Sequence, residues 1–125
     1  MNLIVDSFAW IEFFKGTSRG QKVYGLLENS KNRLYTTTGN YYELYYRLTQ
    51  ECGQLKREEA LAYIRHKTTL LEITEVIARS AGELRLAEGL SAIDAFTLAA
   101  ARINNGKVVT GDKDFDRFKD EIIRI

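Results

Sequence analysis

Cysteine, histidine and proline are nearly absent from this sequence of 125 residues, which has one cysteine, one histidine and no proline. The single cysteine, Cys52, excludes an intrachain disulfide and a zinc site built from cysteines. We interpret it as a small helix residue, because a reactive thiol needs an electropositive setting. His66 has no second histidine with which to build a site, and we do not expect a mechanism that uses histidine as general base.

Long hydrophobic runs and an excess of one charge sign are also missing. No apolar run approaches the ~20 residues of a membrane span, and Met1 leads into a strand-like segment without a basic and then apolar leader. We therefore expect a cytoplasmic protein that does not enter a membrane. The formal net charge is +1, whereas nucleic-acid binders are usually more basic. If one metal site held four of the 17 acidic residues, 13 acidic residues would remain against 18 basic residues. The outer surface would then be moderately basic.

The composition is typical of a folded protein, with 45% hydrophobic, 11% aromatic and 28% charged residues. The length suits one domain, which we expect to span residues 1–125. Strand-like and helix-like segments alternate along the chain, and they predict a three-layer α/β sandwich with a mainly parallel central sheet of four to five strands. The expected strands are residues 3–6, 34–38, 70–73, 107–110 and 122–125, the last at an edge, and the expected helices include 8–14, 40–52 and 57–67.

The first strand points to a site. Leu3, Ile4 and Val5 do not alternate with polar residues, which is typical of a strand buried on both faces of a parallel sheet. This strand ends at Asp6, and ligands of such sheets bind beyond the carboxyl ends of the strands. We expect the next residue, Ser7, to cap a helix by accepting a hydrogen bond from an early helix N–H.

Three further acids occupy comparable positions. Asp112 follows an apolar strand and a glycine, Asp94 comes three residues after the expected helix cap Ser91, and Glu43 lies near the start of its helix. Asp94 and Glu43 could instead satisfy free N–H groups at their helix ends.

Together with Asp6, these acids would meet at one edge of a parallel sheet. Carboxylates this close repel each other unless a cation or protons neutralise them. Mg²⁺ or Mn²⁺ prefers such oxygen ligands, and either ion can activate water for phosphodiester hydrolysis and stabilise the leaving oxygen.

The sequence resembles the PIN-domain ribonucleases, including the VapC-like toxins of prokaryotic toxin–antitoxin pairs. The resemblance covers nearly the whole chain and rests on the order and spacing of four segments: Ile4-Val5-Asp6-Ser7 with Trp10-Ile11, Thr37 with Tyr42-Glu43-Leu44-Tyr45, Leu90-Ser91-Ala92-Ile93-Asp94-Ala95, and Val109-Thr110-Gly111-Asp112-Lys113-Asp114-Phe115.

The resemblance implies a role for several residues. Asp6, Glu43, Asp94 and Asp112 are expected to be catalytic and to form the metal site, with Asp114 as a further contributor. Ser7 and Thr110 are expected to hydrogen-bond to carboxylates or metal-bound water. Asp114 could instead shape the turn before Phe115.

Some residues near these acids could contact RNA. Arg47 and Lys113 could bind phosphate, although Arg47 could instead pair with Glu43. Tyr42 belongs to a group of four tyrosines around Glu43, whose rings could stack on unpaired bases. Packing in the core or in a dimer contact is the competing interpretation of these tyrosines.

We therefore expect a Mg²⁺- or Mn²⁺-dependent endoribonuclease that is the toxin of a type II toxin–antitoxin pair. Its expected partners are RNA, a small antitoxin protein and a second copy of the chain, which would bind through residues 40–67. The alternatives are a PIN-like RNA-binding or assembly module that does not cut, and a PIN nuclease of RNA processing or quality control. A phosphoacceptor receiver-like domain would need a lysine at the end of the last core strand, and this chain offers no convincing one.

Overall fold

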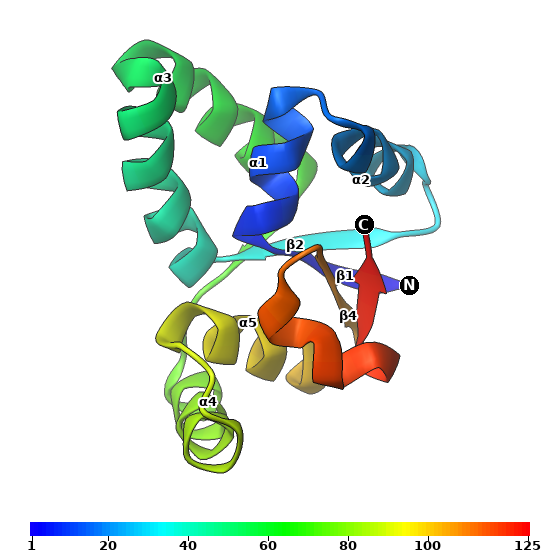
Figure 1. Cartoon of the computed structure of the whole chain (residues 1–125), viewed down its shortest axis with the longest axis vertical. Helices are drawn as coiled ribbons and strands as arrows, with labels where there is room; N and C mark the ends of the chain where they lie inside the picture. Colours follow the sequence, from blue (N-terminus) through cyan, green and yellow to red (C-terminus); the bar gives the residue numbers. More distant parts are fainter.

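A five-stranded parallel sheet runs through the middle of the molecule, as the computed structural model of residues 1–125 shows (Figure 1). The strands are β1 (Asn2–Val5), β2 (Arg33–Thr37), β3 (Thr69–Leu71), β4 (Lys107–Thr110) and β5 (Ile122–Arg124). Their order across the sheet is β3-β2-β1-β4-β5, and all four neighbouring pairs are parallel. The predicted parallel sheet is confirmed, with β5 at an edge as expected.

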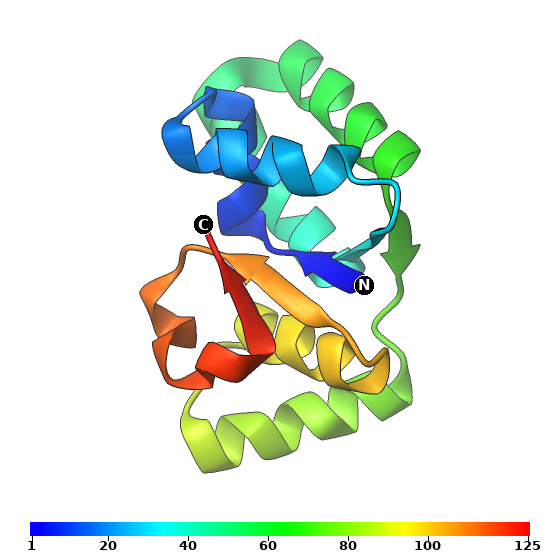
Figure 2. The same cartoon turned by 90° about the vertical axis from the view of Figure 1, so that its right-hand side faces the viewer.

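Helices cover both faces of this sheet and make the three predicted layers (Figure 2). The layer on one face contains α1 (Ser7–Lys15), α2 (Ser18–Glu28) and α3 (Thr38–Lys67). The layer on the other face contains α4 (Glu75–Glu88) and α5 (Ala92–Ile103), and a 3-10 helix, η1 (Lys113–Glu121), connects β4 to β5. No helix combines the length and the apolar character that a membrane crossing requires.

Strand β1 is buried on both faces because its side chains alternate between two separate cores. Leu3 and Val5 belong to the core beneath α1, α2 and α3, where Trp10 is fully buried. Ile4 belongs to the core on the other side, together with Leu98 of α5. An unalternated apolar strand is therefore what this position in the sheet requires.

Helix α3 is broken in the middle at Gly53. This glycine has φ 85° and ψ 169°, which is outside helical geometry and in a region that side chains other than glycine's avoid. The chain therefore changes direction there, and Figure 1 shows the second half of α3 folding back beside α1. The expected end of a helix at residue 52 and start of another at residue 57 agree with this break.

The expected cap at Ser7 is wrong. Asp6 occupies the cap position of α1 and Ser7 is the first helical residue, with no side-chain capping hydrogen bond at this end. The Ser7 hydroxyl instead accepts a hydrogen bond from the side-chain amide of Asn40, at 3.0 Å. A helix that starts one residue earlier leaves the Ser7 side chain free to face α3.

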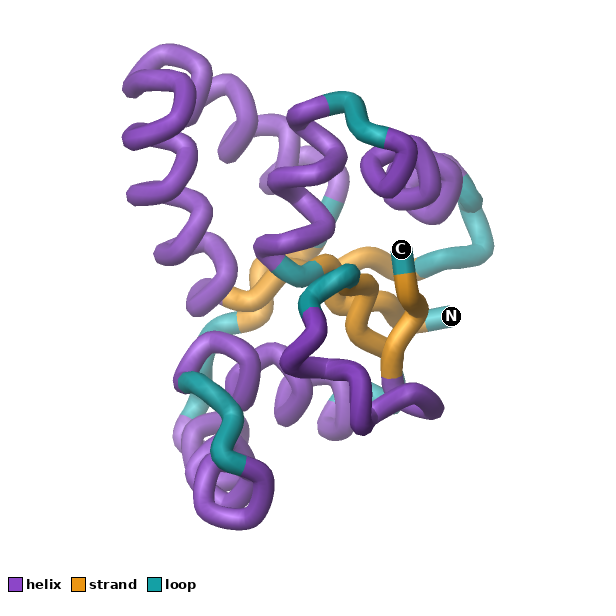
Figure 3. The backbone as a smooth tube through the Cα atoms, viewed as in Figure 1, coloured by secondary structure: helices purple, strands orange, loops and turns teal.

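The strand order reverses direction beside β1. From β1 the chain moves outward to β2 and β3, and it then returns to place β4 on the other side of β1. The short loops that follow β1 and β4 therefore lie side by side (Figure 3), and the Asp6 backbone N–H donates to the Val109 carbonyl at 3.1 Å. Ligands of open α/β sheets bind at such a reversal point.

Candidate functional site

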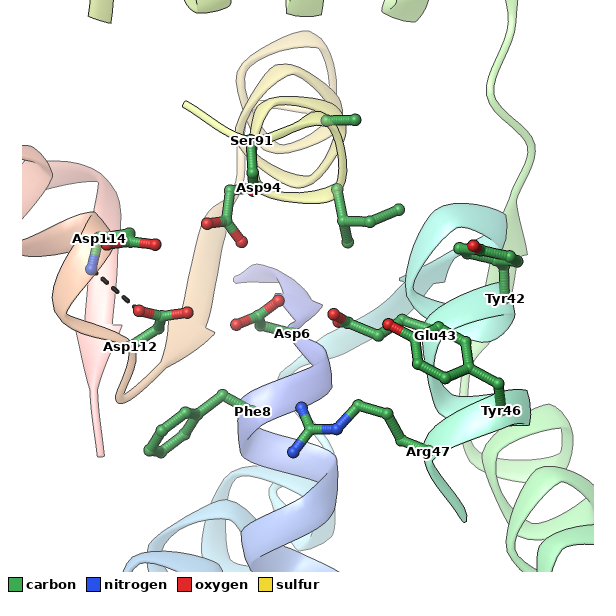
Figure 4. A pocket seen from close by; sticks show the side chains of 12 residues that line it. Asp6, Phe8, Tyr42, Glu43, Tyr46, Arg47, Ser91, Asp94, Asp112 and Asp114 are labelled. Carbon is green, nitrogen blue, oxygen red and sulfur yellow. Dashed lines mark hydrogen bonds between the residues drawn. The ribbon is translucent and has the colours of Figure 1, made fainter. Parts of the chain in front are cut away.

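A cavity of about 490 Å³ opens at this reversal point, and five carboxylates line it (Figure 4). They are Asp6, Glu43, Asp94, Asp112 and Asp114. The structure thus brings together all four acids at strand ends and helix starts, and also Asp114. Its other lining residues are Phe8, Tyr42, Tyr46, Arg47, Ser91, Ala92 and Ile93.

Each acid is positioned by the end of a regular element. Asp6 follows β1 as the cap residue of α1, and Asp112 caps η1 two residues after β4. Asp94 lies in the first turn of α5. Glu43 is the sixth residue of α3 and lies in its second turn, slightly later than expected, because α3 begins at Thr38. The acids come from four separate segments and meet only through the sheet order.

Three of the acids form a tight group that we call the three-aspartate cluster: Asp94, Asp112 and Asp114. Each offers an oxygen within 4.8 Å of the others. An Asp112 carboxylate oxygen also accepts a hydrogen bond from the Asp114 backbone N–H at 2.9 Å, which fixes the turn that presents both. Figure 4 shows Asp6 beside this cluster and Glu43 pointing toward Asp6 from α3.

The Asp6 carboxylate is held by a donor on each oxygen. The Thr110 hydroxyl donates to one oxygen at 2.8 Å, and the Asn40 side-chain amide donates to the other at 3.2 Å. Thr110 therefore contacts a carboxylate of the site, whereas Ser7 contacts the Asn40 amide. Both donors are buried, so the orientation of Asp6 is set by the fold.

Asn40 is one of two site residues that sequence reasoning missed. Its side-chain oxygen accepts hydrogen bonds from the hydroxyls of Thr37 and Thr97, at 2.8 Å and 3.3 Å, and its amide nitrogen donates to Asp6 and Ser7. It is fully buried. Asn40 lies three residues after the end of β2, in the first turn of α3, so a search for polar residues near strand ends as well as directly after them could have identified it.

The pKa values of two acids are raised. Burial is the main cause for Asp6, whose pKa rises to about 6 even though the Thr110 hydrogen bond lowers it. Burial is also the main cause for Asp94, and the negative charges of Asp6 and Asp112 add to it, so that its pKa is about 7. The charges of Asp6 and Asp112 disfavour ionisation of Asp94, and a bound cation would relieve this repulsion.

No side chain of the protein supplies that cation. None of the five acids forms a salt bridge. Arg47 lines the cavity, but its partner is Glu51 at 3.8 Å and not Glu43, so that alternative is wrong. Lys113 is exposed and does not line the cavity. Phe8, which sequence reasoning also missed, closes one side of the cavity (Figure 4).

Known structures share this fold. The toxin VapC20 of Mycobacterium tuberculosis, which cleaves the sarcin–ricin loop, aligns with a TM-score of 0.80 and 19% identity over 98% of each chain. VapBC of Salmonella typhimurium, bound to DNA, aligns with a TM-score of 0.77 and 14% identity, over 100% of this chain and 97% of that one. VapBC2 of Rickettsia felis, bound to a DNA fragment from its promoter, aligns with a TM-score of 0.76 and 19% identity, over 98% of this chain and 96% of that one.

Comparison of the amino-acid sequence with known proteins shows which family the chain belongs to. A search among curated proteins gave no significant match. The family model of the PIN domain matches residues 3–121, which include every acid of the cavity. The chain therefore belongs to the PIN-domain family.

Proposed function

We propose that this protein is a divalent-metal-dependent endoribonuclease that hydrolyses RNA phosphodiester bonds. The observation that carries the proposal is the convergence of five carboxylates from four segments on one open cavity that contains no ion pair. A purely structural role does not account for it, because crowded carboxylates destabilise a fold unless they are neutralised.

The donor set fits Mg²⁺ or Mn²⁺. Both ions take carboxylate oxygens, and Mg²⁺ keeps several waters, so a few carboxylates on an open cavity suffice. The three-aspartate cluster would hold the ion, with Asp6 and Glu43 completing the acidic site from the other side. A bound divalent ion would supply Lewis-acid stabilisation of the phosphodiester and would lower the pKa of the attacking water.

The residues of the chain do the positioning. Thr110 and Asn40 hold the two oxygens of Asp6, so this carboxylate is in place before any ligand arrives. The hydrogen bond from the Asp114 backbone N–H to the Asp112 carboxylate positions Asp112 in the same way. Preorganised groups of this kind avoid reorganisation at the moment of reaction.

We also propose that the protein is the toxin of a type II pair and binds a small antitoxin protein. Solved structures with this fold include a toxin–antitoxin complex from Klebsiella pneumoniae, with a TM-score of 0.71 and 20% identity over 90% of this chain and 89% of that one. An antitoxin encoded next to this protein, when coexpressed with it, should form a stable complex in which RNA cleavage is suppressed. Active nuclease in such a complex would argue against the pairing.

A homodimer through residues 40–67 is part of the same proposal. Leu55 on the second half of α3 is 75% exposed, and Tyr45 on the first half is also exposed. Apolar side chains of this kind are common in subunit contacts. Light scattering of the purified protein should give twice the mass of the 14.3 kDa chain, and Leu55→Asp should shift the mass toward that of one chain.

Cleavage of a mixed RNA pool tests the nuclease. The wild-type protein should cut with Mg²⁺ or Mn²⁺ and stop when EDTA is added, and Asp6→Asn and Asp94→Asn should each lower the rate at least about 100-fold. Asp120→Asn, which changes an exposed acid outside the cavity, is the matched control and should cut at the normal rate. Cleavage that survives EDTA and both site substitutions would refute the mechanism. Absence of cleavage in every condition would favour a PIN-like RNA-binding module.

A further inference from the structure

We infer that Tyr42 and Tyr46 form a stacking platform for an unpaired RNA base at the edge of the acidic cavity. This inference rests on the proposed function, because it takes RNA as the ligand. It assigns a role in substrate positioning to two residues of α3 that are not acids and that form no hydrogen bond with the acids of the cavity.

The structure separates the four tyrosines on the first half of α3 into different environments. Tyr41 packs against the core beneath α1, α2 and α3. Tyr45 is occupied by Arg57, whose guanidinium lies 4.1 Å from the ring centre. Tyr42 and Tyr46 remain 64% and 41% exposed, and both line the cavity. Core packing therefore accounts for Tyr41 but not for the two tyrosines at the cavity.

The two exposed rings form a pair next to the acids. They lie one helical turn apart on the same face of α3, with ring centres 5.5 Å apart and planes inclined at 60°. Figure 4 shows both rings beside Glu43, on the side of the cavity that α3 forms. A base stacked on one ring would place its own backbone near the carboxylates. Stacking on aromatic rings is sequence-tolerant, because every base has a flat π-face.

Arg47 supplies a cation next to this pair. It follows Tyr46 in α3 and lines the same cavity, and its one ion pair is the 3.8 Å contact with Glu51. Both of these side chains are more than one-third exposed, so the pair is weak and the guanidinium is available to a phosphate. Aromatic rings with a neighbouring cation are the combination that binds single strands, in which bases stack and phosphates pair with basic groups.

A duplex does not suit the same surface. In an A-form helix the bases are stacked on one another, and proteins contact mainly phosphates and 2′-hydroxyls across the minor groove. The exposed faces of Tyr42 and Tyr46 would have no base to receive. The rings therefore favour an unpaired segment, such as a loop, over a continuous duplex.

Fluorescence of 2-aminopurine in a short RNA tests the platform. The parent protein is Asp94→Asn, which keeps the RNA intact, and the probe is a decamer with one 2-aminopurine, used single-stranded or annealed to its complement. Protein should quench the single-stranded probe, and Tyr42→Ala/Tyr46→Ala should weaken binding by about tenfold or more. Tyr42→Phe/Tyr46→Phe, which keeps both rings, should bind within about twofold of the parent.

Tyr24→Ala is the matched control, because Tyr24 is an exposed tyrosine of α2 outside the cavity. It should bind like the parent, and the annealed probe should show no tyrosine dependence. Single-strand binding that is unchanged in the double alanine variant overturns the inference and leaves the rings to a protein partner. An equal loss in the phenylalanine variant also overturns it, because the hydroxyls and not the ring faces would then be responsible.

The outcomes keep the inference separate from the proposed function. Tyrosine-dependent binding by a wild-type protein that never cuts RNA refutes the nuclease and leaves the platform in place. Metal-dependent cutting together with tyrosine-independent binding refutes the platform and leaves the nuclease. Thermal unfolding of each variant checks that the exposed substitutions leave the fold intact.

Discussion

Asn40 connects the elements that build the acidic site. Its amide donates to Asp6, which follows β1, and its oxygen accepts from Thr97 of α5. An asparagine suits this place because it has donors and acceptors on one short side chain, whereas an aspartate would have no donor for the Asp6 carboxylate. Both ends of the side chain are hydrogen-bonded in a buried setting, where unpaired polar groups are costly.

Replacing Asn40 should show this dependence. Asn40→Asp should lower the free energy of unfolding at pH 8 by about 2 kcal/mol or more, because it removes the donor and places a second carboxylate against Asp6. Asn40→Ala, which adds no charge, should lower the free energy of unfolding by a smaller amount. Urea unfolding at pH 8 and pH 5 measures the free energy of unfolding of both variants. The difference between the two variants should be smaller at pH 5, where carboxylates are more protonated. Equal losses at both pH values would contradict the charge argument.

The raised pKa values of Asp6 and Asp94 set the pH dependence of the metal-free protein. Both values, about 6 and about 7, lie above the ordinary 3.8 of an aspartate. The folded state therefore binds these protons more tightly than the unfolded state does. The resulting stabilisation is fully present below about pH 4 and is lost as the pH rises through 6 to 7.

Asp94→Asn tests this sign, because the amide mimics the protonated carboxyl. In EDTA at pH 8 the variant should be more stable than the wild type by about 1–2 kcal/mol, a value smaller than the full pKa shift implies because the carboxylate borders an open cavity that water can enter. At pH 4 the difference should vanish. Denaturant unfolding across this range measures it, and a variant that is less stable at pH 8 would contradict the assignment.

At the scale of elements, the break in α3 positions its first half against the cavity. Gly53 turns the chain, and Arg57 then reaches back to the first half. Arg57 donates to the Thr49 hydroxyl at 3.0 Å and lies over the Tyr45 ring. These contacts join the two halves of α3, and Glu43 and the tyrosine pair lie on the half that they brace.

Gly53→Ala should therefore destabilise the protein by about 1–3 kcal/mol, because alanine avoids the φ and ψ found there. Space is not the reason, since nothing lies within 4 Å of an added Cβ. Gly82→Ala in α4 is the matched control, as it also meets nothing within 4 Å but has helical geometry, and it should be neutral or stabilising by up to about 1 kcal/mol. Calorimetric unfolding compares the two, and equal effects would contradict the conformational argument.

Much of this element order could be predicted from sequence, because the signals are local. The apolar run of β1 shows that it is buried on both faces, and Gly53 marks a break whatever surrounds it. The sequence predicts element ends less accurately: it favours Ser7 as a cap, whereas Ser7 is the first residue of α1. A cap depends on one backbone angle, which neighbouring elements can shift.

The site could be predicted only in part, for a related reason. Asp6 and Asp112 stand out because they follow apolar strands, and the parallel order then brings them together. The role of Asn40 depends on Thr97, which is 57 residues away in sequence. Likewise, only the folded structure shows that Tyr41 packs inward and Tyr42 faces the cavity.

At the scale of the whole molecule, the topology gathers negative charge in one cavity although the formal net charge is +1. A ligand that binds only the folded state raises its stability by mass action. Mn²⁺ at about 100 times its dissociation constant should therefore stabilise the wild type by about 2.7 kcal/mol. The Asp112→Asn variant should lose most of this stabilisation by Mn²⁺. Thermal unfolding with and without Mn²⁺ measures it, with Asp120→Asn as the control that should keep the full effect.

The carboxylates at the edge of the sheet are proposed to form a metal site. Anomalous diffraction from crystals grown with Mn²⁺ can show this site, because the method locates the ion without reference to activity. The expected result is a Mn²⁺ peak within about 2.5 Å of carboxylate oxygens of the three-aspartate cluster. A cavity without a peak at saturating Mn²⁺, in crystals whose carboxylates keep the arrangement described above, would contradict the proposal.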